Sequence, residues 1–413
     1  MTRARPHPQA TSDTQPTVSG RIDAIWSNRR LRRAWLVCAA SATLWLTLHF
    51  ITHPSMLDLS VYRNEGLALR HGVALYGPIG AQYGLQATYP PFAALCFTTL
   101  TLIPLGLCLA LVAAANLILL GLAVEFSRRL VARRLGELNA LGLPLVLAAG
   151  IWFEPVYATL HFGQINLLIL VLILWEFTRP PHARSRGVAL GLATALKITP
   201  ALFIVYLLLT KRLRFAATAL VTFGGATLLS FAVRPHETVR FWTSLVFDTT
   251  RVGNMANPSN QSVRGVLVRA AHRFDLGALG VVAIAITAVV GLACSVAAYR
   301  RRGEAWGLCA AAVTGLLVSP ISWSHHWVWC VPIAVLFLAS GRRATTRVRY
   351  GLTAAFLVFF SYLVSVYPSD PTRNLHMSVG AQLISMPYFL FGVLFLALAV
   401  GRWGPYRPPV STT

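Results

Sequence analysis

Apolar runs about as long as a membrane-spanning helix recur along almost the whole chain. The first begins at Ala34 and the last ends at Val400, and a helix needs roughly 20 apolar residues to cross a bilayer. Because 56% of the 413 residues are hydrophobic and only 12% are charged, no second, soluble domain fits. The sequence predicts one all-α polytopic membrane domain over residues 34–401, between a disordered cytoplasmic tail at 1–33 and a cytoplasmic tail at 402–413.

Arginine fixes the expected orientation of this domain. The net charge of +23 would suggest nucleic-acid binding in a soluble protein, but here the arginines form short clusters at the ends of apolar runs. Cytoplasmic loops are enriched in Lys and Arg, so each cluster is expected inside and neighbouring clusters must enclose an even number of crossings. The clusters lie at 29–33, 128–134, 179–186, 211–214, 300–302, 342–349 and 402–407.

This rule gives about twelve crossings with both termini inside. The first long outer loop, 54–104, is expected to hold two juxtamembrane helices: an amphipathic one around residues 57–67, anchored by Leu57, Val61 and Leu67, and a short apolar one at 92–103. The run 187–210 must be two half-spans that meet at Lys197–Pro200. The predicted spans are 34–53, 105–127, 143–160, 164–178, the two halves of 187–210, 214–233, 276–299, 305–320, 327–340, 350–367 and 383–401.

With this orientation, most polar residues outside the basic clusters fall on or near the outer face. Ionisable groups at or near membrane depth are costly, so they are read first as functional. The candidates come from six separate segments. They are Asp58, Tyr62, Arg63, Glu65, Tyr89, Glu154, His161, Gln164, Asn166, Lys197, Arg251, Asn260, Gln261, Arg264, Trp323, His325 and His326.

Each of the main candidates also has a structural explanation, and both stay open at this stage. Asp58 could be a general base or the N-cap of a helix, where Asp is favoured. Glu154 could line a site or serve as the charge partner of Lys197. Lys197 itself, at the break of the half-spans, could face an anion such as a phosphate or snorkel to the interface.

The remaining candidates are weighed in the same way. Because His325 and His326 are adjacent, they point in different directions, so at most one is expected to enter a given site. Arg251 and Arg264, with Asn260 and Gln261, suit recognition of sugar hydroxyls or phosphate, although a solvated loop is the commoner explanation. The six cysteines lack a ligand spacing, and neither the histidine pair nor a dense acidic cluster indicates a metal site.

Eight segments in order resemble the polyprenol-phosphate-mannose-dependent mannosyltransferases of actinobacteria, which form glycosyltransferase family 87 within the C-type glycosyltransferase fold. The resemblance covers most of the chain. The segments are DLSVYR (58–63), HGVALYG (71–77), TYPPFAAL (88–95), WFEPV (152–156), HFGQINLL (161–168), GLATALKITPALF (191–203), SNQSVRG (259–265) and SPISWSHHWVW (319–329).

The resemblance implies transfer of mannose, with inversion, from polyprenyl-phosphate mannose to a mannosylated lipid acceptor at the outer face of the plasma membrane, giving an α-1,2 linkage. The acceptor would be a phosphatidylinositol mannoside, lipomannan or lipoarabinomannan. Asp58 would be the general base, and Lys197, His326, Arg251 and Arg264 would stabilise the leaving phosphate. The other candidates except Glu65 would bind substrate, and no metal or other cofactor is expected.

Two alternatives remain at this point. No motif reads the sugar ring directly, so the same fold could use an arabinofuranosyl or another polyprenyl-phosphate sugar. A lipid or solute transporter is the alternative from another class, but it would distribute polar residues through the membrane depth to both sides. The candidates concentrate near the outer face instead, which favours an enzyme.

Overall fold

The computed structural model describes residues 28–401 except 53, 55, 78–85, 136–137, 342–352 and 354–355. Within these ranges every regular element is helical, and the β contact is an isolated antiparallel bridge between Asn260 and Trp323. The prediction of an all-α protein is therefore confirmed. Residues 1–27 and 402–413 of the predicted tails lie outside the described residues, as does the basic cluster at 342–349. The predicted end of the first tail is wrong, because residues 29–33 already form the start of the first long helix.

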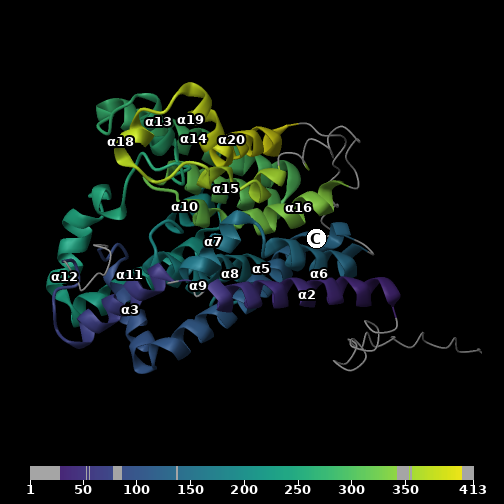
Figure 1. Cartoon of the computed structure of the whole chain (residues 1–413), viewed down its shortest axis with the longest axis horizontal. Coiled ribbons are helices and arrows are strands. Elements are labelled where there is room, and N and C mark those ends of the chain that lie inside the picture. The colour runs from purple at the N-terminus through teal and green to yellow at the C-terminus, as the bar shows by residue number, and fades with distance from the viewer. Residues whose placement is uncertain are drawn as a thin grey trace, which may run out of the picture.

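The helices follow the order of the predicted spans, with several short helices inserted between them (Figure 1). They are α2 (Arg29–Thr52), α3 (Leu57–Arg70), α4 (Pro91–Phe97), η1 (Thr98–Leu102), α5 (Leu105–Leu135), α6 (Leu138–Gly150), α7 (Glu154–Phe162), α8 (Asn166–Thr178), α9 (Val188–Leu196), α10 (Ala201–Leu209), α11 (Leu213–Val233), α12 (Pro235–Arg240), η2 (Phe241–Leu245), η3 (Thr249–Val252), α13 (Val263–Ala270), α14 (Gly277–Arg302), α15 (Glu304–Val318), η4 (Ser324–Trp329), α16 (Cys330–Gly341), η5 (Val358–Phe360), η6 (Leu363–Ser365), α18 (Pro371–Leu375), α19 (Val379–Ser385) and α20 (Pro387–Val400).

Among the described residues, four helices are long and apolar enough to cross a bilayer: α2, α5, α11 and α14. The pairs α6–α7 and α19–α20, bent by 61° and 67°, raise the number to six if each pair is one span. These helices make the chain a multi-pass membrane protein. The predicted spans at 34–53, 105–127, 214–233 and 276–299 are confirmed as single helices, whereas the total of about twelve stays a prediction.

Proline marks both bends. Pro155 stands in the first turn of α7 and Pro387 in the first turn of α20. Proline has no N–H to continue a preceding helix but fits the first turn of a new one. Each predicted span, 143–160 and 383–401, is therefore two helices at an angle rather than one straight rod.

The predicted span at 350–367 is wrong from Val358 onward. There the chain forms single 3₁₀ turns, η5 and η6, and Tyr362 between them has φ 50°. A non-glycine residue in the left-handed region is costly and cannot continue an α-helix. Apolar composition alone did not reveal this break. Most of the preceding part of that span lies outside the described residues.

The first long loop holds the two predicted helices, and α3 is packed against protein. Its buried face carries Leu59, Tyr62 and Glu65. Gly66 lets α3 approach the end of α4, since an added Cβ would lie 2.5 Å from the carbonyl oxygen of Phe97. The predicted membrane anchors are only half-buried: Leu57, Val61 and Leu67.

Different helices lie at the two ends of the helical body (Figure 1). The start of α2 and the end of α20 point toward one end, where Arg301 and Arg302 donate to the carbonyls of Val400 and Gly401. The opposite end carries α3 and α12, with α13 and α18 at its other edge. The basic start of α2 is thus separated from the loops that hold most site candidates.

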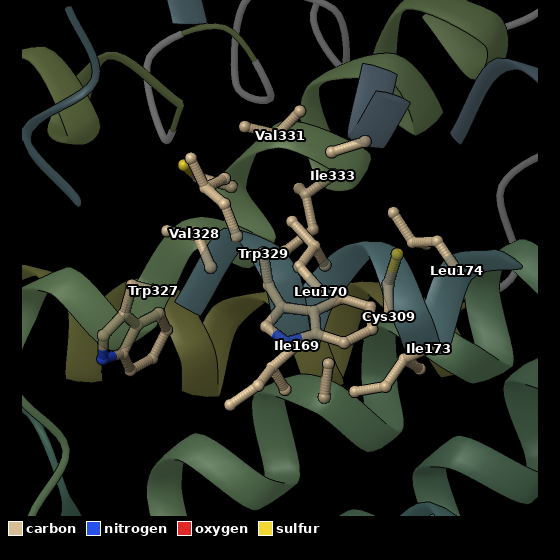
Figure 2. Packing of buried hydrophobic residues seen from close by; sticks show 14 of the residues in the cluster. Ile169, Leu170, Ile173, Leu174, Cys309, Trp327, Val328, Trp329, Val331 and Ile333 are labelled. Carbon is tan, nitrogen blue, oxygen red and sulfur yellow. The ribbon is translucent and has the colours of Figure 1, made fainter. Parts of the chain in front are cut away.

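The most buried helices are short ones in the middle of the body. Nearly every residue of α15 is buried, and so is most of α8. Figure 2 shows the ring of Trp329 among side chains of α8, with Ile169, Leu170 and Ile173 around it. This packing fixes η4, the segment that carries the histidine pair, against α8.

Candidate functional site

Asp58 is the first polar group of the site, and it is not a helix cap. The N-cap of α3 is Met56, whose φ is 41°, and Asp58 follows within the first helical turn. Met56 packs near Gly163, which has φ 68°; an added Cβ at Gly163 would lie 2.8 Å from the Cβ of Leu59. The glycine therefore allows the start of α3 to lie against the α7–α8 turn, which brings Asp58 to Gln164.

The Asp58 side chain is half-buried and lies in a polar environment. It is hydrogen-bonded to Gln164 and interacts electrostatically with Lys197. Burial disfavours the charged form and raises the pKa of Asp58 to about 6, while Gln164 and Lys197 oppose this shift. A carboxylate with a pKa just below neutrality is suited to accept a proton from a substrate.

Two tyrosines connect Gln164 to Lys197. The hydroxyl of Tyr62 donates to Gln164 Oε1 at 2.6 Å and lies 2.9 Å from the hydroxyl of Tyr89. Tyr89 also donates to Gln164 Oε1 at 3.3 Å. Because both tyrosines point at the amide oxygen, the Gln164 NH₂ group is left to donate to Asp58. All three side chains are buried.

Lys197 lies directly after α9, at the break between α9 and α10. Its Nζ lies 3.1 Å from Asn166 Oδ1, 3.1 Å from His326 Nε2 and 3.5 Å from the Tyr89 hydroxyl. An ammonium group can only donate, so His326 Nε2 must accept and the His326 proton is then on Nδ1. The predicted break at Lys197–Pro200 is confirmed, with α9 and α10 each too short to cross a bilayer alone.

The histidine pair divides as expected, with His326 facing Lys197. The ring of His325 is buried against Phe162 at 5.7 Å. The carbonyl of His325 accepts from Thr159 Oγ1 and Asn166 Nδ2, both at 3.0 Å. His325 thus positions η4 and Asn166, and only His326 contacts the cation.

A cavity of about 60 Å³ opens beside Lys197. Its polar side carries Asn166, Lys197, Thr199 and His326. The first residues of α8 and α10 line it, so the positive ends of two helix dipoles face the same space. Its other walls are apolar, and Figure 2 shows several of them. They are Ile169, Leu170, Ile173, Phe203, Leu316, Val328 and Trp329.

The described contacts of Glu154 exclude the predicted pairing with Lys197. Its two carboxylate oxygens accept from Ser324 Oγ at 2.8 Å and from the Tyr388 hydroxyl at 2.7 Å. The acidic group that interacts with Lys197 is Asp58. The charge-partner prediction is therefore wrong, because the bend before α7 turns Glu154 toward η4 and α20. The sequence analysis did not single out Tyr388, which follows the proline that starts α20.

Asn260 and Gln261 are fully buried and hold loops together. Gln261 Nε2 donates to the carbonyls of Pro258 and Ser385, and its Oε1 accepts from two backbone amides at the start of α20. Asn260 Oδ1 accepts from the Ser322 amide at 2.9 Å. Trp323 pairs with Asn260 through the backbone. Their position favours a structural role, and their predicted contact with substrate stays a prediction.

The two loop arginines are also engaged elsewhere. Arg251 donates to the carbonyls of Ala87 and Leu245 at 2.7 and 3.2 Å. Arg264 donates to Thr249 Oγ1 at 3.1 Å. The contact of Arg251 with Ala87 ties the two long loops together, whereas the contact of Arg264 stays within the second loop. Neither arginine lines the cavity beside Lys197. Their predicted role at the phosphate remains untested.

Three other predicted residues lie around the cluster. Arg63 donates to the carbonyl of Ile103 at 3.2 Å, which ties α3 to the segment after η1. His161, half-buried at the end of α7, stacks on Tyr157. Glu65 is buried on the same face of α3 as Tyr62, and desolvation raises its pKa to about 8.

Thr199 and Trp329 line the cavity but were not among the predicted site residues. Both stand within motifs that predicted other site residues, KITP and SHHWVW, so their chain position was available as a signal. Their side-chain direction was not, because it depends on how α8, α10 and η4 pack around the cavity.

The fold and the site together define a multi-pass membrane protein in which a half-buried carboxylate, Asp58, interacts with a half-buried lysine, Lys197, that lines a partly apolar cavity. The family model for glycosyltransferase family 87 matches residues 87–320. The chain belongs to glycosyltransferase family 87. The matched range includes Gln164, Lys197 and the residues around them, while α3 with Asp58 precedes it.

Curated relatives from mycobacteria share about a third of their residues with this chain. A polyprenol-phosphate-mannose-dependent α-(1-2)-phosphatidylinositol pentamannoside mannosyltransferase of Mycobacterium tuberculosis (strain CDC 1551 / Oshkosh) is 37% identical over 305 residues, 73% of this chain and 70% of the relative. A polyprenol-phosphate-mannose-dependent α-(1-2)-phosphatidylinositol mannoside mannosyltransferase of Mycolicibacterium smegmatis is 33% identical over 365 residues, 79% of each chain. No solved structure matches the chain significantly.

Proposed function

We propose that this protein transfers mannose from polyprenyl-phosphate mannose to a mannosylated lipid acceptor and forms an α-1,2 linkage. The acceptor class is a phosphatidylinositol mannoside or the mannan of lipomannan or lipoarabinomannan. The observation that carries the proposal is the connected cluster from Asp58 through Gln164 and Tyr89 to Lys197. The activities for which the mycobacterial relatives are named support the donor, the acceptor class and the linkage.

In this reaction Asp58 takes the proton of the attacking acceptor hydroxyl. The resulting oxygen nucleophile attacks the anomeric carbon of the mannosyl phosphate, and the bond from that carbon to the phosphate oxygen breaks with inversion. The electron pair leaves with polyprenyl phosphate. Asp58 needs to be ionised to act as the base, and its pKa of about 6 permits this at neutral pH.

Lys197 is suited to the leaving group. Its ammonium faces the cavity together with the N-terminal ends of α8 and α10. These positive groups stabilise the negative charge that grows on the departing phosphate. The walls that continue from them, such as Ile169 and Trp329, are apolar, as the isoprenoid chain of the donor requires of its surroundings.

We also propose that the reaction requires no divalent metal. A phosphate leaving group with a pre-placed lysine and two helix ends needs little further charge neutralisation. Among the residues that the structure describes, no three His, Cys, Asp or Glu side chains form a group suited to a metal ion. The supporting measurement is unchanged transfer after treatment with a chelator.

The proposal includes the orientation and the finer architecture. The basic end with Arg301 and Arg302 is cytoplasmic, the end with α3 and α18 faces the outside of the plasma membrane, and both termini are cytoplasmic. This orientation follows the enrichment of Arg in cytoplasmic loops. About twelve crossings in a C-type glycosyltransferase fold are then formed partly by short helices such as α8, α9 and α10.

The test is transfer of radiolabelled mannose from polyprenyl-phosphate mannose to phosphatidylinositol mannosides by membranes that contain the protein. We expect Asp58→Asn to lower kcat by about 10²–10⁴-fold, since general-base catalysis contributes this much. Asp248→Asn is the matched control, because Asp248 is exposed and interacts with Thr250 in the outer loop.

Full activity of a normally folded Asp58→Asn protein would disprove the assignment of the base. Mass spectrometry of the product identifies the acceptor and the linkage. Competition with other polyprenyl-phosphate sugars then identifies the donor, and a preference for an arabinofuranosyl donor would replace mannose in the proposal.

A further inference from the structure

A second cavity, of about 460 Å³, lies away from the Asp58–Lys197 cluster, beside α18 and the start of α19. Its volume is within the range of small-ligand sites, roughly 300–1,000 Å³. None of its residues takes part in the proposed transfer of mannose. Its lining residues are Tyr367, Pro368, Thr372, Arg373, Asn374, His376, Met377 and Ala381.

The cavity carries nitrogen donors without partners. Asn374 is only 2% exposed, yet its Nδ2 has no hydrogen-bond acceptor. A buried donor of this kind costs free energy unless a ligand or water satisfies it. Arg373 is exposed, and its side chain makes no hydrogen bond or ion pair within the described part of the chain. The site therefore offers a guanidinium and an amide to an incoming acceptor group.

The surroundings hold these donors in place. Asp370 caps α18 by accepting from the amides of Thr372 and Arg373 at 2.9 and 3.0 Å, so its carboxylate is engaged with the backbone. The imidazole of His376 stacks on that of His272, with centroids 5.9 Å apart. His272 Nδ1 lies 2.7 Å from the carbonyl of Leu375 and fixes its own ring. The cavity is thus open to the surface, but its backbone and its histidine are held by these contacts.

An apolar strip adjoins the cavity. Val379, Leu383 and Ile384 of α19 are 75%, 51% and 43% exposed, and Val366 is 56% exposed. Exposed apolar side chains in a membrane protein of this kind face lipid chains. A ligand that fills the cavity and covers this strip must combine an anionic or hydroxyl-rich head with hydrocarbon chains.

We propose that this cavity binds the phosphodiester headgroup of the anionic glycophospholipid acceptor, with Arg373, Asn374 and His376 as donors and α19 against the acyl chains. Arginine is suited to a phosphodiester because its planar fork can donate two parallel hydrogen bonds. This inference rests on the proposed function and adds the place at which the acceptor is held.

The position of the cavity agrees with the chemistry of such an acceptor. In a mannosylated phosphoinositide, sugar residues separate the phosphate from the reacting hydroxyl, so the phosphate must lie away from the base. Figure 1 shows α18 and α3 at the same end of the molecule but at opposite edges. Leu375 of α18 packs in one apolar cluster with Trp323, two residues before His325 in the chain. The cluster links the headgroup cavity to the segment that carries His326.

The test uses the full-length protein in detergent with the double variant Arg373→Gln/His376→Gln. We expect an increase of about tenfold in KM for a phosphatidylinositol mannoside, with kcat unchanged. KM for a short mannose oligosaccharide without phosphate should not change. Arg273→Gln is the matched control, because Arg273 is also exposed near this face but does not line the cavity. Asn374 is left intact, since its burial makes it a risk for folding.

A parallel binding measurement is independent of catalysis. Native mass spectrometry should show that the wild-type protein retains phosphatidylinositol in preference to phosphatidylcholine, and that the double variant loses this preference. Equal effects of the double variant and Arg273→Gln would overturn the proposal, as would an equal rise in KM for both acceptors. Displacement of the lipid by millimolar inorganic phosphate would indicate a free-phosphate site instead. If no mannose is transferred at all, the proposed function fails while the lipid-binding result still decides this inference.

Discussion

At the residue scale, Lys197 joins the two halves of the polar cluster. Its ammonium reaches Asn166 and His326 on one side and Tyr89 on the other. Three neutral partners match its three donor hydrogens and hold its position without neutralising its charge. A fixed cation of this kind is a preorganised ligand for a phosphate, because no reorganisation is needed when charge develops.

The first prediction concerns the pH dependence that Asp58 and Lys197 share. Asp58 must be ionised to act as a base and its pKa is about 6, so kcat/KM should fall about tenfold per pH unit below about pH 6. Lys197 lowers this pKa, so removing its charge raises it. In Lys197→Gln the acid limb of the remaining activity should therefore move to higher pH, measured as the rate of mannose transfer between pH 4.5 and 8.

The control for this prediction is Lys211→Gln, which removes the other lysine of the chain. Lys211 lies between α10 and α11, next to the basic cluster, and does not contribute to the pKa of Asp58. The acid limb of the pH–rate profile of Lys211→Gln should match that of the wild-type protein. If the acid limb of Lys197→Gln also lay at the wild-type pH, the electrostatic coupling between Lys197 and Asp58 would be contradicted.

The sequence identified the residues of this cluster as candidates, but it did not show that they lie together in space. Asp58, Gln164, Lys197 and His326 were candidates from the sequence, and the structure brings them together. Asn260 was an equally good candidate by its chemistry. It is buried in backbone contacts because the loop folds under η4, which no local pattern indicates.

At the element scale, the α7–α8 turn determines where α3 begins and so where Asp58 lies. Gly163 ends α7 with φ 68° and leaves room for Met56 and Leu59 of the incoming chain. A short helix of fourteen residues such as α3 is marginal in isolation. Its position therefore depends on packing against this turn and against Phe97.

The second prediction tests this packing with Gly163→Ala. An added Cβ would lie 2.8 Å from the Cβ of Leu59, and the left-handed φ costs about 1–2 kcal/mol for a residue with a side chain. We expect a lower Tm for the purified protein and a loss of activity of about tenfold or more. Differential scanning fluorimetry and the transfer assay measure the two effects.

Gly72→Ala separates strain from contact. Gly72 has φ 71°, but nothing lies within 4 Å of its added Cβ. This variant should carry the backbone strain alone and retain most of its activity. If both variants lost activity to the same degree, contact between Gly163 and α3 would not explain the position of Asp58.

At the scale of the whole molecule, long helices cover a core of short ones. In the most apolar 18-residue stretches of α2 and α14, only 11% and 17% of the residues are buried. Most of their side chains are therefore free to contact lipid. The short helix α15 is almost entirely buried. A site near one end of such a body is reachable by a lipid-linked donor from the membrane side.

The third prediction tests the proposed orientation by cysteine labelling. In a protein without its six native cysteines, Ser365→Cys should react with a membrane-impermeant maleimide in intact cells, because η6 contacts α19, which follows α18 at the proposed outer end. His182→Cys, in the basic connection between α8 and α9, should react only after permeabilisation. Both positions are exposed. The reverse pattern would invert the topology and place the site in the cytoplasm.

The sequence by itself determined the properties that depend on neighbouring residues. Apolar runs required helices in a bilayer, because only a helix satisfies its own backbone groups there. The KITP segment ended one half-span and began another at Pro200. Four long spans, the break at Lys197 and the helix that carries Asp58 were all predicted from such local chemistry.

Only the tertiary structure decided which distant groups meet. Tyr62 and Gln164 are 102 residues apart, and Lys197 and His326 are 129 apart. Glu154 binds Tyr388, 234 residues away, rather than the lysine expected to pair with it. Such contacts follow from the packing angles of bent helices and from close approach at single glycines. Neither quantity is encoded in the periodicity or composition of one segment.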